Sequence, residues 1–161
     1  MPANLTFDRT KQRVLPIWLL ILAGLLIIAR IVSSHYPVLA DVDLVHWTNI
    51  DQARVLAARV HRPIFYEFSA AWCGPCHALE RDVFMDPSLA AKINSRYIAV
   101  KVIDTQRELG HNDPDVQILM DRYGVNAFPT IVIAAADGSV HDRVVGYTGA
   151  SSFAAMIDRA H

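Results

Sequence analysis

The longest apolar stretch of the chain lies near its start, from Val14 to Val32, and Arg30 is its single charged residue. A helix rises ~1.5 Å per residue, so this stretch nearly matches a hydrocarbon core ~30 Å thick. We therefore expect a transmembrane anchor over 14–32. Residues 33–40 contain Pro37 and show no periodicity, which predicts a short linker before a folded domain over 41–161.

The charges on either side of this stretch indicate its orientation. Basic residues precede it and acidic residues follow it, namely Arg9, Lys11 and Arg13 before, and Asp41 and Asp43 after. The positive-inside rule makes 1–13 a cytoplasmic flank and places the domain on the periplasmic, extracytoplasmic side of a bacterial-type inner membrane. A cleaved signal peptide is the alternative, because Ile17 to Ala29 has the length of a signal-peptide core and Val38-Leu39-Ala40 suits a signal peptidase.

Beyond residue 41, β-type and helical patterns alternate. Apolar runs bounded by turn residues predict strands over 42–47, 64–69, 97–103, 130–134 and 140–145. Capping residues and helical periodicity predict helices over 50–60, from 73 onward, 87–94, 114–123 and 151–159, with Thr48, Asp86, Asp113 and Ser151 or Ser152 as caps. Strands that alternate with helices and end in one hairpin indicate an α/β fold, in which a mixed sheet has helices on both faces.

Composition narrows the classes of function. The 161 residues carry a formal charge of -1, so no basic excess points to a nucleic-acid partner. Only two cysteines occur, Cys73 and Cys76, which excludes a scaffold built on several disulfides. The pair is therefore reactive, metal-binding, haem-bearing or incidental.

The sequence Trp72-Cys73-Gly74-Pro75-Cys76 follows a predicted strand and opens a predicted helix, the context in which a CxxC motif has a redox role. At a helix start, free backbone N–H groups and the macrodipole stabilise a thiolate, so we expect Cys73 to be the nucleophile. Cys76 lies about one turn deeper on nearly the same face and can resolve a mixed disulfide. Pro75 is tolerated in the first turn and stiffens the loop.

The WCGPC motif, together with Phe128-Pro129-Thr130 before a late strand, resembles the thioredoxin superfamily. The resemblance implies a thioredoxin fold with a cis Pro129 facing the cysteines and a backbone edge beside it that pairs with substrate. It also matches Glu67 to the buried acid that moves the proton of the second cysteine, although the superfamily has Asp there. In this apolar strand desolvation would favour the protonated form of Glu67. Trp72, Gly74, Pro75, Phe128 and Pro129 are the implied substrate-binding residues.

A further similarity is to the periplasmic C-terminal domain of DsbD-type thiol-disulfide interchange proteins. It covers about 64–157 and rests on Glu80, Phe84-Met85-Asp86-Pro87, the stretch from Asn112-Asp113 to Val125, and Val145-Gly146-Tyr147 before Phe153. It implies that Glu80, one helical turn from Cys76, is a second acid acting on that cysteine. Those transporters carry several membrane spans and another folded domain, whereas this chain has one candidate span.

Three other classes of function compete with this interpretation. Cys73 to His77 also spells CxxCH, the attachment pattern of c-type haem. Zinc would need four ligands from two cysteines and five scattered histidines, with no second pair at ligand spacing, namely His46, His61, His77, His111 and His141. A non-catalytic binding module would be expected to have lost a cysteine.

We therefore expect a membrane-anchored protein-disulfide reductase that needs no cofactor. Its expected partners are disulfide-containing exported proteins as substrates and a membrane electron donor. The Gly74-Pro75 dipeptide resembles reducing thioredoxins, but an oxidising compartment also suits an oxidase or isomerase. Lys101 is a candidate ion-pair partner of Glu67 on the neighbouring strand, and a solvent-facing lysine is the alternative.

Overall fold

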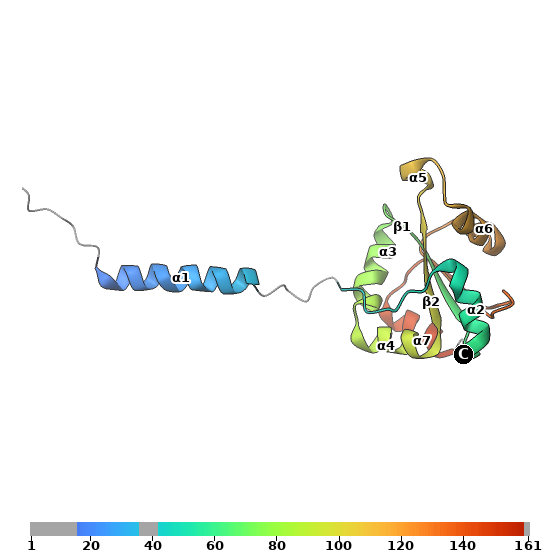
Figure 1. Cartoon of the computed structure of the whole chain (residues 1–161), viewed down its shortest axis with the longest axis horizontal. Coiled ribbons are helices and arrows are strands. Elements are labelled where there is room, and N and C mark those ends of the chain that lie inside the picture. Colours follow the sequence, from blue (N-terminus) through green and yellow to red (C-terminus); the bar gives the residue numbers. More distant parts are fainter. Residues whose placement is uncertain (1–15, 36–41, 160–161) are drawn as a thin grey trace, which may run out of the picture. The chain divides into compact units, whose positions relative to one another are not determined.

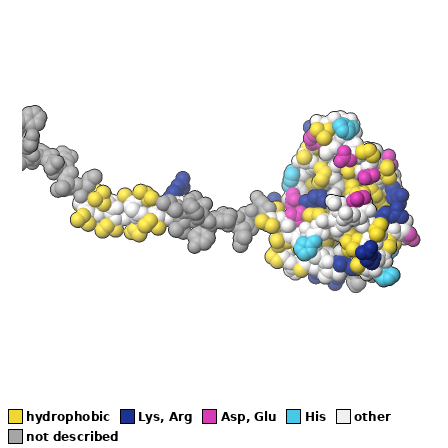
Figure 2. Space-filling model, in the orientation of Figure 1, with side chains coloured by type: hydrophobic (Ala, Val, Ile, Leu, Met, Phe, Trp, Pro, Cys, Tyr) yellow, Lys and Arg dark blue, Asp and Glu magenta, His cyan; other side chains and the backbone are white. Residues whose placement is uncertain are grey.

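The computed structural model describes residues 16–35 and 42–159, which belong to two units, 1–40 and 41–161. The first unit contains helix α1 (Ile17–His35) (Figure 1). Its surface is largely hydrophobic (Figure 2), and its exposed large apolar side chains include Trp18 and Leu22. Within the described residues, no helix reaches the length and apolarity that a membrane crossing requires. The expected cytoplasmic flank 1–13, most of the linker, the candidate cleavage site 38–40 and Asp41 lie outside the described residues.

The second unit is built on a four-stranded sheet in the order β2-β1-β3-β4. The strands are β1 (Ile64–Ala70), β2 (Ile98–Asp104), β3 (Thr130–Ala134) and β4 (Val140–Val145). β1 pairs with β2 in parallel, while β1–β3 and β3–β4 are antiparallel, so the expected mixed sheet and its hairpin are confirmed.

The expected first strand over 42–47 is wrong. This segment forms one isolated bridge, between Trp47 and Ala99. Its shape is set instead by Asp43, whose carboxylate accepts hydrogen bonds from the Val45 amide and the Trp47 indole. A short polar side chain that bonds to its own neighbouring backbone competes with a strand ladder in this way.

Seven helical segments of the second unit are described: α2 (Ile50–Val60), α3 (Gly74–Leu79), the π-helix η1 (Glu80–Phe84), α4 (Pro87–Arg96), α5 (Gln106–Leu109), α6 (Pro114–Tyr123) and α7 (Ala150–Arg159). The cap at Asp86 is confirmed, because its Oδ1 accepts from the Leu89 amide at 2.8 Å. The N-cap of α2 is Asn49 and not Thr48, and the N-cap of α6 is Asp113, as expected. Neither the Asn49 nor the Asp113 side chain makes a capping hydrogen bond. α7 starts at Ala150, and α5 was not expected.

Helices cover both faces of the sheet, as expected (Figure 1). Side chains of α3, η1, α4 and α7 pack around Phe65 on one face. Side chains of α2 and α6 pack around Tyr66 and Phe68 on the other. Since successive residues of a strand point to opposite faces, Glu67 shares the Phe65 face, beneath α3 and η1.

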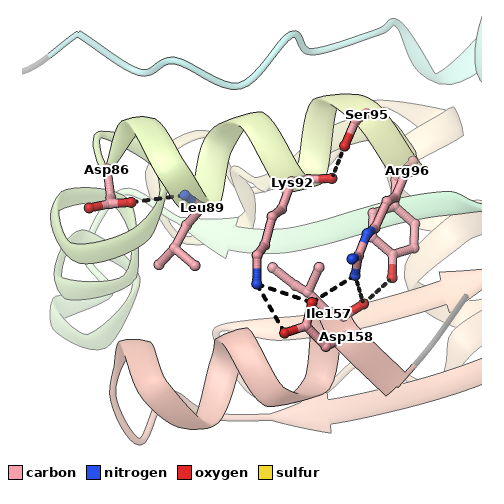
Figure 3. A network of polar contacts seen from close by, with 8 residues as sticks. Asp86, Leu89, Lys92, Ser95, Arg96, Ile157 and Asp158 are labelled. Atoms are coloured by element: carbon pink, nitrogen blue, oxygen red, sulfur yellow. Dashed lines mark hydrogen bonds and ion pairs between the residues drawn. The ribbon is translucent and has the colours of Figure 1, made fainter.

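On the Phe65 face, α4 and α7 are joined by a cluster of polar contacts (Figure 3). The Asp158 carboxylate accepts from Lys92 at 3.0 Å and from Arg96 at 2.7 Å. The Tyr97 hydroxyl donates to the Ile157 carbonyl at 2.8 Å. These contacts tie the last helix to the body of the domain.

Candidate active site

The cysteine pair lies where β1 ends and α3 begins. Cys73 is the N-cap of α3, and its Sγ is bonded to the Sγ of Cys76 at 2.05 Å. The Cys76 amide donates to the Cys73 sulfur at 3.2 Å. This amide would also stabilise a thiolate on Cys73 once the disulfide is reduced. The strand-to-helix position expected for a redox CxxC motif is therefore confirmed.

Aromatic side chains border the disulfide. Phe128 packs against Cys73 and Cys76, and the Phe128–Pro129 peptide bond is cis, as the resemblance implied. The Trp72 ring meets Phe128 edge to face at 5.9 Å between centroids and is 48% exposed. Both cysteines are buried in this disulfide form, whereas Gly74 and Pro75, in the first turn of α3, are exposed.

The guanidinium of Arg107, from the unexpected helix α5, lies 5.3 Å from the centroid of the Trp72 ring. Its loop is fixed by Asn112, which accepts from the Thr105 amide at 2.6 Å and donates to Asp104 at 2.7 Å. Sequence reasoning missed this neighbour of the motif, because a four-residue helix gives no periodic signal.

The CxxCH and zinc interpretations can be compared with the same geometry. The two sulfurs are bonded to each other, and the His77 Nε2 lies 2.9 Å from the Ala71 carbonyl. Among residues 16–35 and 42–159, no group of three or more His, Cys, Asp or Glu side chains is arranged to hold a metal ion.

Glu67 is buried, with 1% of its surface exposed, and its Oε2 has no hydrogen-bond partner. Burial raises the pKa of Glu67 to about 7, because desolvation disfavours the carboxylate. The ammonium of Lys101 and a hydrogen bond from Ser69 act in the opposite direction, while the carboxylates of Glu80 and Asp43 raise the pKa further. The carboxyl can therefore gain or lose a proton near neutral pH.

Lys101 lies opposite Glu67 in the β1–β2 register, as expected. Its partners are different from the expected one: Nζ is 2.9 Å from Asp43 Oδ2 and 2.9 Å from Glu80 Oε1. Burial opposes the charge on Lys101, yet the bonds to Glu80 and Asp43 outweigh it and raise the pKa of the ammonium. Glu80 thus lies in the cluster that surrounds Glu67, one turn beyond Cys76.

Asp43 is a second residue that sequence reasoning missed, since it counted there only as a charge flanking the apolar stretch. Its Oδ2 accepts from Lys101 and from the Trp47 indole at 2.7 Å. Asp43 lies 24 positions before Glu67, and no spacing rule connects two such residues.

Comparison with known proteins agrees with this geometry. The sequence profile of the thioredoxin-like domain family matches residues 50–161. The chain belongs to the thioredoxin-like family. Two curated relatives are thiol:disulfide interchange proteins DsbD. The one from Ralstonia nicotianae is 28% identical over 70% of this chain and 18% of its own length, and the one from Photorhabdus laumondii is 24% identical over 67% and 18%.

This thioredoxin-like chain therefore spans about a fifth of the length of those relatives. Among solved structures, a DsbH oxidoreductase aligns with a TM-score of 0.64 at 21% identity, over 77% of this chain and 88% of its own. The oxidised C-terminal domain of Neisseria meningitidis DsbD aligns at 0.55 with 19% identity, over 67% and 89%. At these identities the structural matches establish the fold.

Proposed function

We propose that this thioredoxin-like protein is a protein-disulfide reductase that works through Cys73 and Cys76. The observation that carries the proposal is the Cys73–Cys76 disulfide at the start of a helix, over a sheet face that holds the buried acid Glu67. A structural disulfide would not need a buried carboxyl with one unpartnered oxygen, Glu67 Oε2, on the face covered by the same helix. A dithiol that exchanges protons as well as electrons would.

In the proposed cycle the reduced protein meets a substrate disulfide beside Phe128 and Pro129. The Cys73 thiolate attacks one substrate sulfur, which forms a mixed disulfide and releases the other sulfur as a thiolate. Cys76 then loses its proton to the Glu67 carboxylate, and its sulfur attacks Cys73. The second substrate thiolate leaves, so two electrons have passed to the substrate and the Cys73–Cys76 disulfide remains.

The reductive direction requires a partner that restores the dithiol. A dithiol donor in the membrane can reduce the Cys73–Cys76 disulfide by the reverse exchange, because each exchange step is reversible. Support for this direction comes from the Gly74-Pro75 dipeptide and from the DsbD relatives, whose name describes thiol:disulfide interchange.

We further propose that the protein acts on the outer side of a bacterial inner membrane, tethered by residues 14–32. This part rests on the sequence, in which three basic residues precede the apolar stretch and two acidic residues follow it. Exported proteins that carry oxidised cysteines would then be its substrates.

Capture of substrates tests the proposed activity. Cys76→Ser should leave the mixed disulfide on Cys73 unresolved, so the variant should accumulate covalent adducts in cells that run as discrete bands on non-reducing gels. Cys73→Ser should form no adducts and should abolish disulfide reduction. Adducts through a mixed disulfide should disappear on treatment with dithiothreitol. If the Cys76→Ser protein folds but forms no such adducts, the proposed activity is contradicted.

A further inference from the structure

Segment 42–48 contributes the carboxylate of Asp43 to the charged cluster beneath α3 and η1. Asp43 is fixed at three points: Oδ1 accepts from the Val45 amide at 3.0 Å, and Oδ2 accepts from the Trp47 indole at 2.7 Å and from Lys101 at 2.9 Å. The segment is itself held on the domain, because the Leu44 amide donates to the Phe84 carbonyl and the Thr48 amide to the Ala99 carbonyl. The position of this carboxylate is therefore set by the fold.

Lys101 has three acidic side chains within electrostatic reach and binds two of them. Asp43 and Glu80 each lie 2.9 Å from Nζ, on a side chain that is 24% exposed. The rings of Trp47 and Phe84 also flank the ammonium, at 4.9 and 5.6 Å from Nζ to the ring centroids. This enclosure satisfies Lys101 without a bond to the third acid, Glu67, whose Oε2 is left unpartnered.

Asp43 therefore acts on Glu67 in two ways that have the same sign. Its own negative charge disfavours a second negative charge on Glu67. It also retains Lys101, the one cation among the groups that act on Glu67, on the Glu80 side. Without Asp43, Lys101 would be shared between Glu80 and Glu67, and a cation close to Glu67 favours its charged form.

We propose that Asp43 is a positioning residue: together with Glu80 it holds the Lys101 ammonium, so that Lys101 forms no ion pair with Glu67 and the Glu67 carboxyl stays free to accept the proton of Cys76. The inference rests on the proposed function, because it assigns Asp43 a part in the proton transfer from Cys76. The groups that face Glu67 in this arrangement are Lys101 on β2, Glu80 on η1, Asp43 on segment 42–48 and Ser69 on β1.

The test is the titration of Glu67 by carboxyl ¹³C NMR on the full-length, disulfide-bonded protein in detergent. The wild-type signal should titrate near pH 7. Asp43→Asn should lower that midpoint by about one unit or more, as expected when an opposite charge gains access to a carboxyl. Lys101→Met should move it upward, because the ammonium is the largest influence that lowers the Glu67 pKa. A loss of packing would not produce shifts of opposite sign.

Two further variants complete the design. Asp43→Glu keeps the carboxylate and should restore the midpoint to within a few tenths of a unit of the wild type. Asp158→Asn removes an acid that also binds two cations, but at the α4–α7 surface, and should leave Glu67 unchanged. The proposal is overturned if Asp43→Asn leaves the Glu67 midpoint unmoved or raises it. If the Asp43→Asn variant does not fold, the proposal is overturned when Lys101→Met fails to raise the midpoint.

This titration needs no substrate, so its failure can be told apart from failure of the proposed function. Opposite shifts in a protein whose Cys76→Ser variant captures nothing would support the role of Asp43 and contradict the reductase. Efficient substrate capture by Cys76→Ser, with no shift of the Glu67 midpoint in Asp43→Asn, would support the reductase and contradict the role of Asp43. In the reductase assay, the pH midpoint of the resolving step should follow the NMR midpoint in each variant.

Discussion

Two clusters of acidic and basic side chains lie on the same side of the sheet, but they differ in burial. In one, Lys92 and Arg96 bind Asp158 at the surface between α4 and α7, where the Asp158 side chain is 44% exposed (Figure 3). In the other, Asp43 and Glu80 bind Lys101 over Glu67, which is 1% exposed. Both clusters join segments that are far apart in the sequence.

The difference shows that burial, and not the number of charges, determines whether an acid in the cluster can exchange a proton near neutral pH. At the surface, water screens each ion pair, and hydrogen bonds from Lys92 and Arg96 lower the pKa of Asp158. In the interior, desolvation raises the pKa of Glu67 to about 7. The first cluster therefore contains a permanent carboxylate, whereas the second contains an acid that can change state under physiological conditions.

The largest expected effect is on stability as a function of pH. The pKa of Glu67 in the folded protein, about 7, lies above its ordinary value of 4.5. The contribution of Glu67 to the free energy of unfolding is therefore fully present below about pH 4.5 and is lost as the pH rises through about 7. The cost above that window is up to about 3 kcal/mol. Glu67→Gln should remove this cost, so urea unfolding at pH 8 should show a variant more stable than the wild type.

Measurements at pH 4.5 and pH 8 provide the control for that prediction. At the lower pH the folded wild type carries a neutral carboxyl at position 67, as the folded variant carries a neutral amide, so their unfolding free energies should be close. A Glu67→Gln protein with the same pH dependence as the wild type would show that Glu67 does not titrate in this window.

The second effect concerns catalysis. Glu67→Gln should slow the resolving step by about 100-fold, because a general base of matched pKa is lost, and should change the first attack by Cys73 much less. Stopped-flow kinetics with a fluorescent disulfide substrate separates formation of the mixed disulfide from its resolution. Equal slowing of both steps would remove the assigned role of Glu67.

Much of the buried cluster could not be predicted from the sequence, whereas the redox motif could. WCGPC, its strand-to-helix setting, the hairpin and the cis bond before Pro129 follow from local patterns and from one family resemblance. Asp43 and Glu80 meet at Lys101 because segment 42–48 lies alongside β2, where Trp47 forms a parallel bridge with Ala99. The composition of that segment predicts a strand. The short helix α5, which brings Arg107 to Trp72, has too few residues for a periodic signal.

A smaller effect is expected at the surface cluster. Asp158→Asn should lower the urea midpoint slightly and should leave the change of stability between pH 4.5 and pH 8 as in the wild type, since Asp158 titrates below that range and its ion pairs are screened by water. Unfolding at pH 4.5 and pH 8 tests both points. A pH dependence altered as strongly as in Glu67→Gln would contradict the contrast between the two clusters.

The smallest effect is expected at Arg107. Arg107→Ala removes the cation from the Trp72 ring and should lower kcat/KM about two- to five-fold, the range of an exposed cation–π contact. Arg59→Ala, on the exposed side of α2, is the matched control and should have no effect. Equal rates for the two variants would show that Arg107 takes no part in substrate contact.

The most direct test of the reductase assignment is the redox equilibrium of Cys73 and Cys76 against glutathione or dithiothreitol, followed by Trp72 fluorescence. We predict a single two-electron transition near the ~-270 mV of thioredoxin. A potential near ~-120 mV, as in strong thiol oxidants, would contradict the reductive direction. The absence of a two-electron transition would contradict redox exchange by this pair altogether.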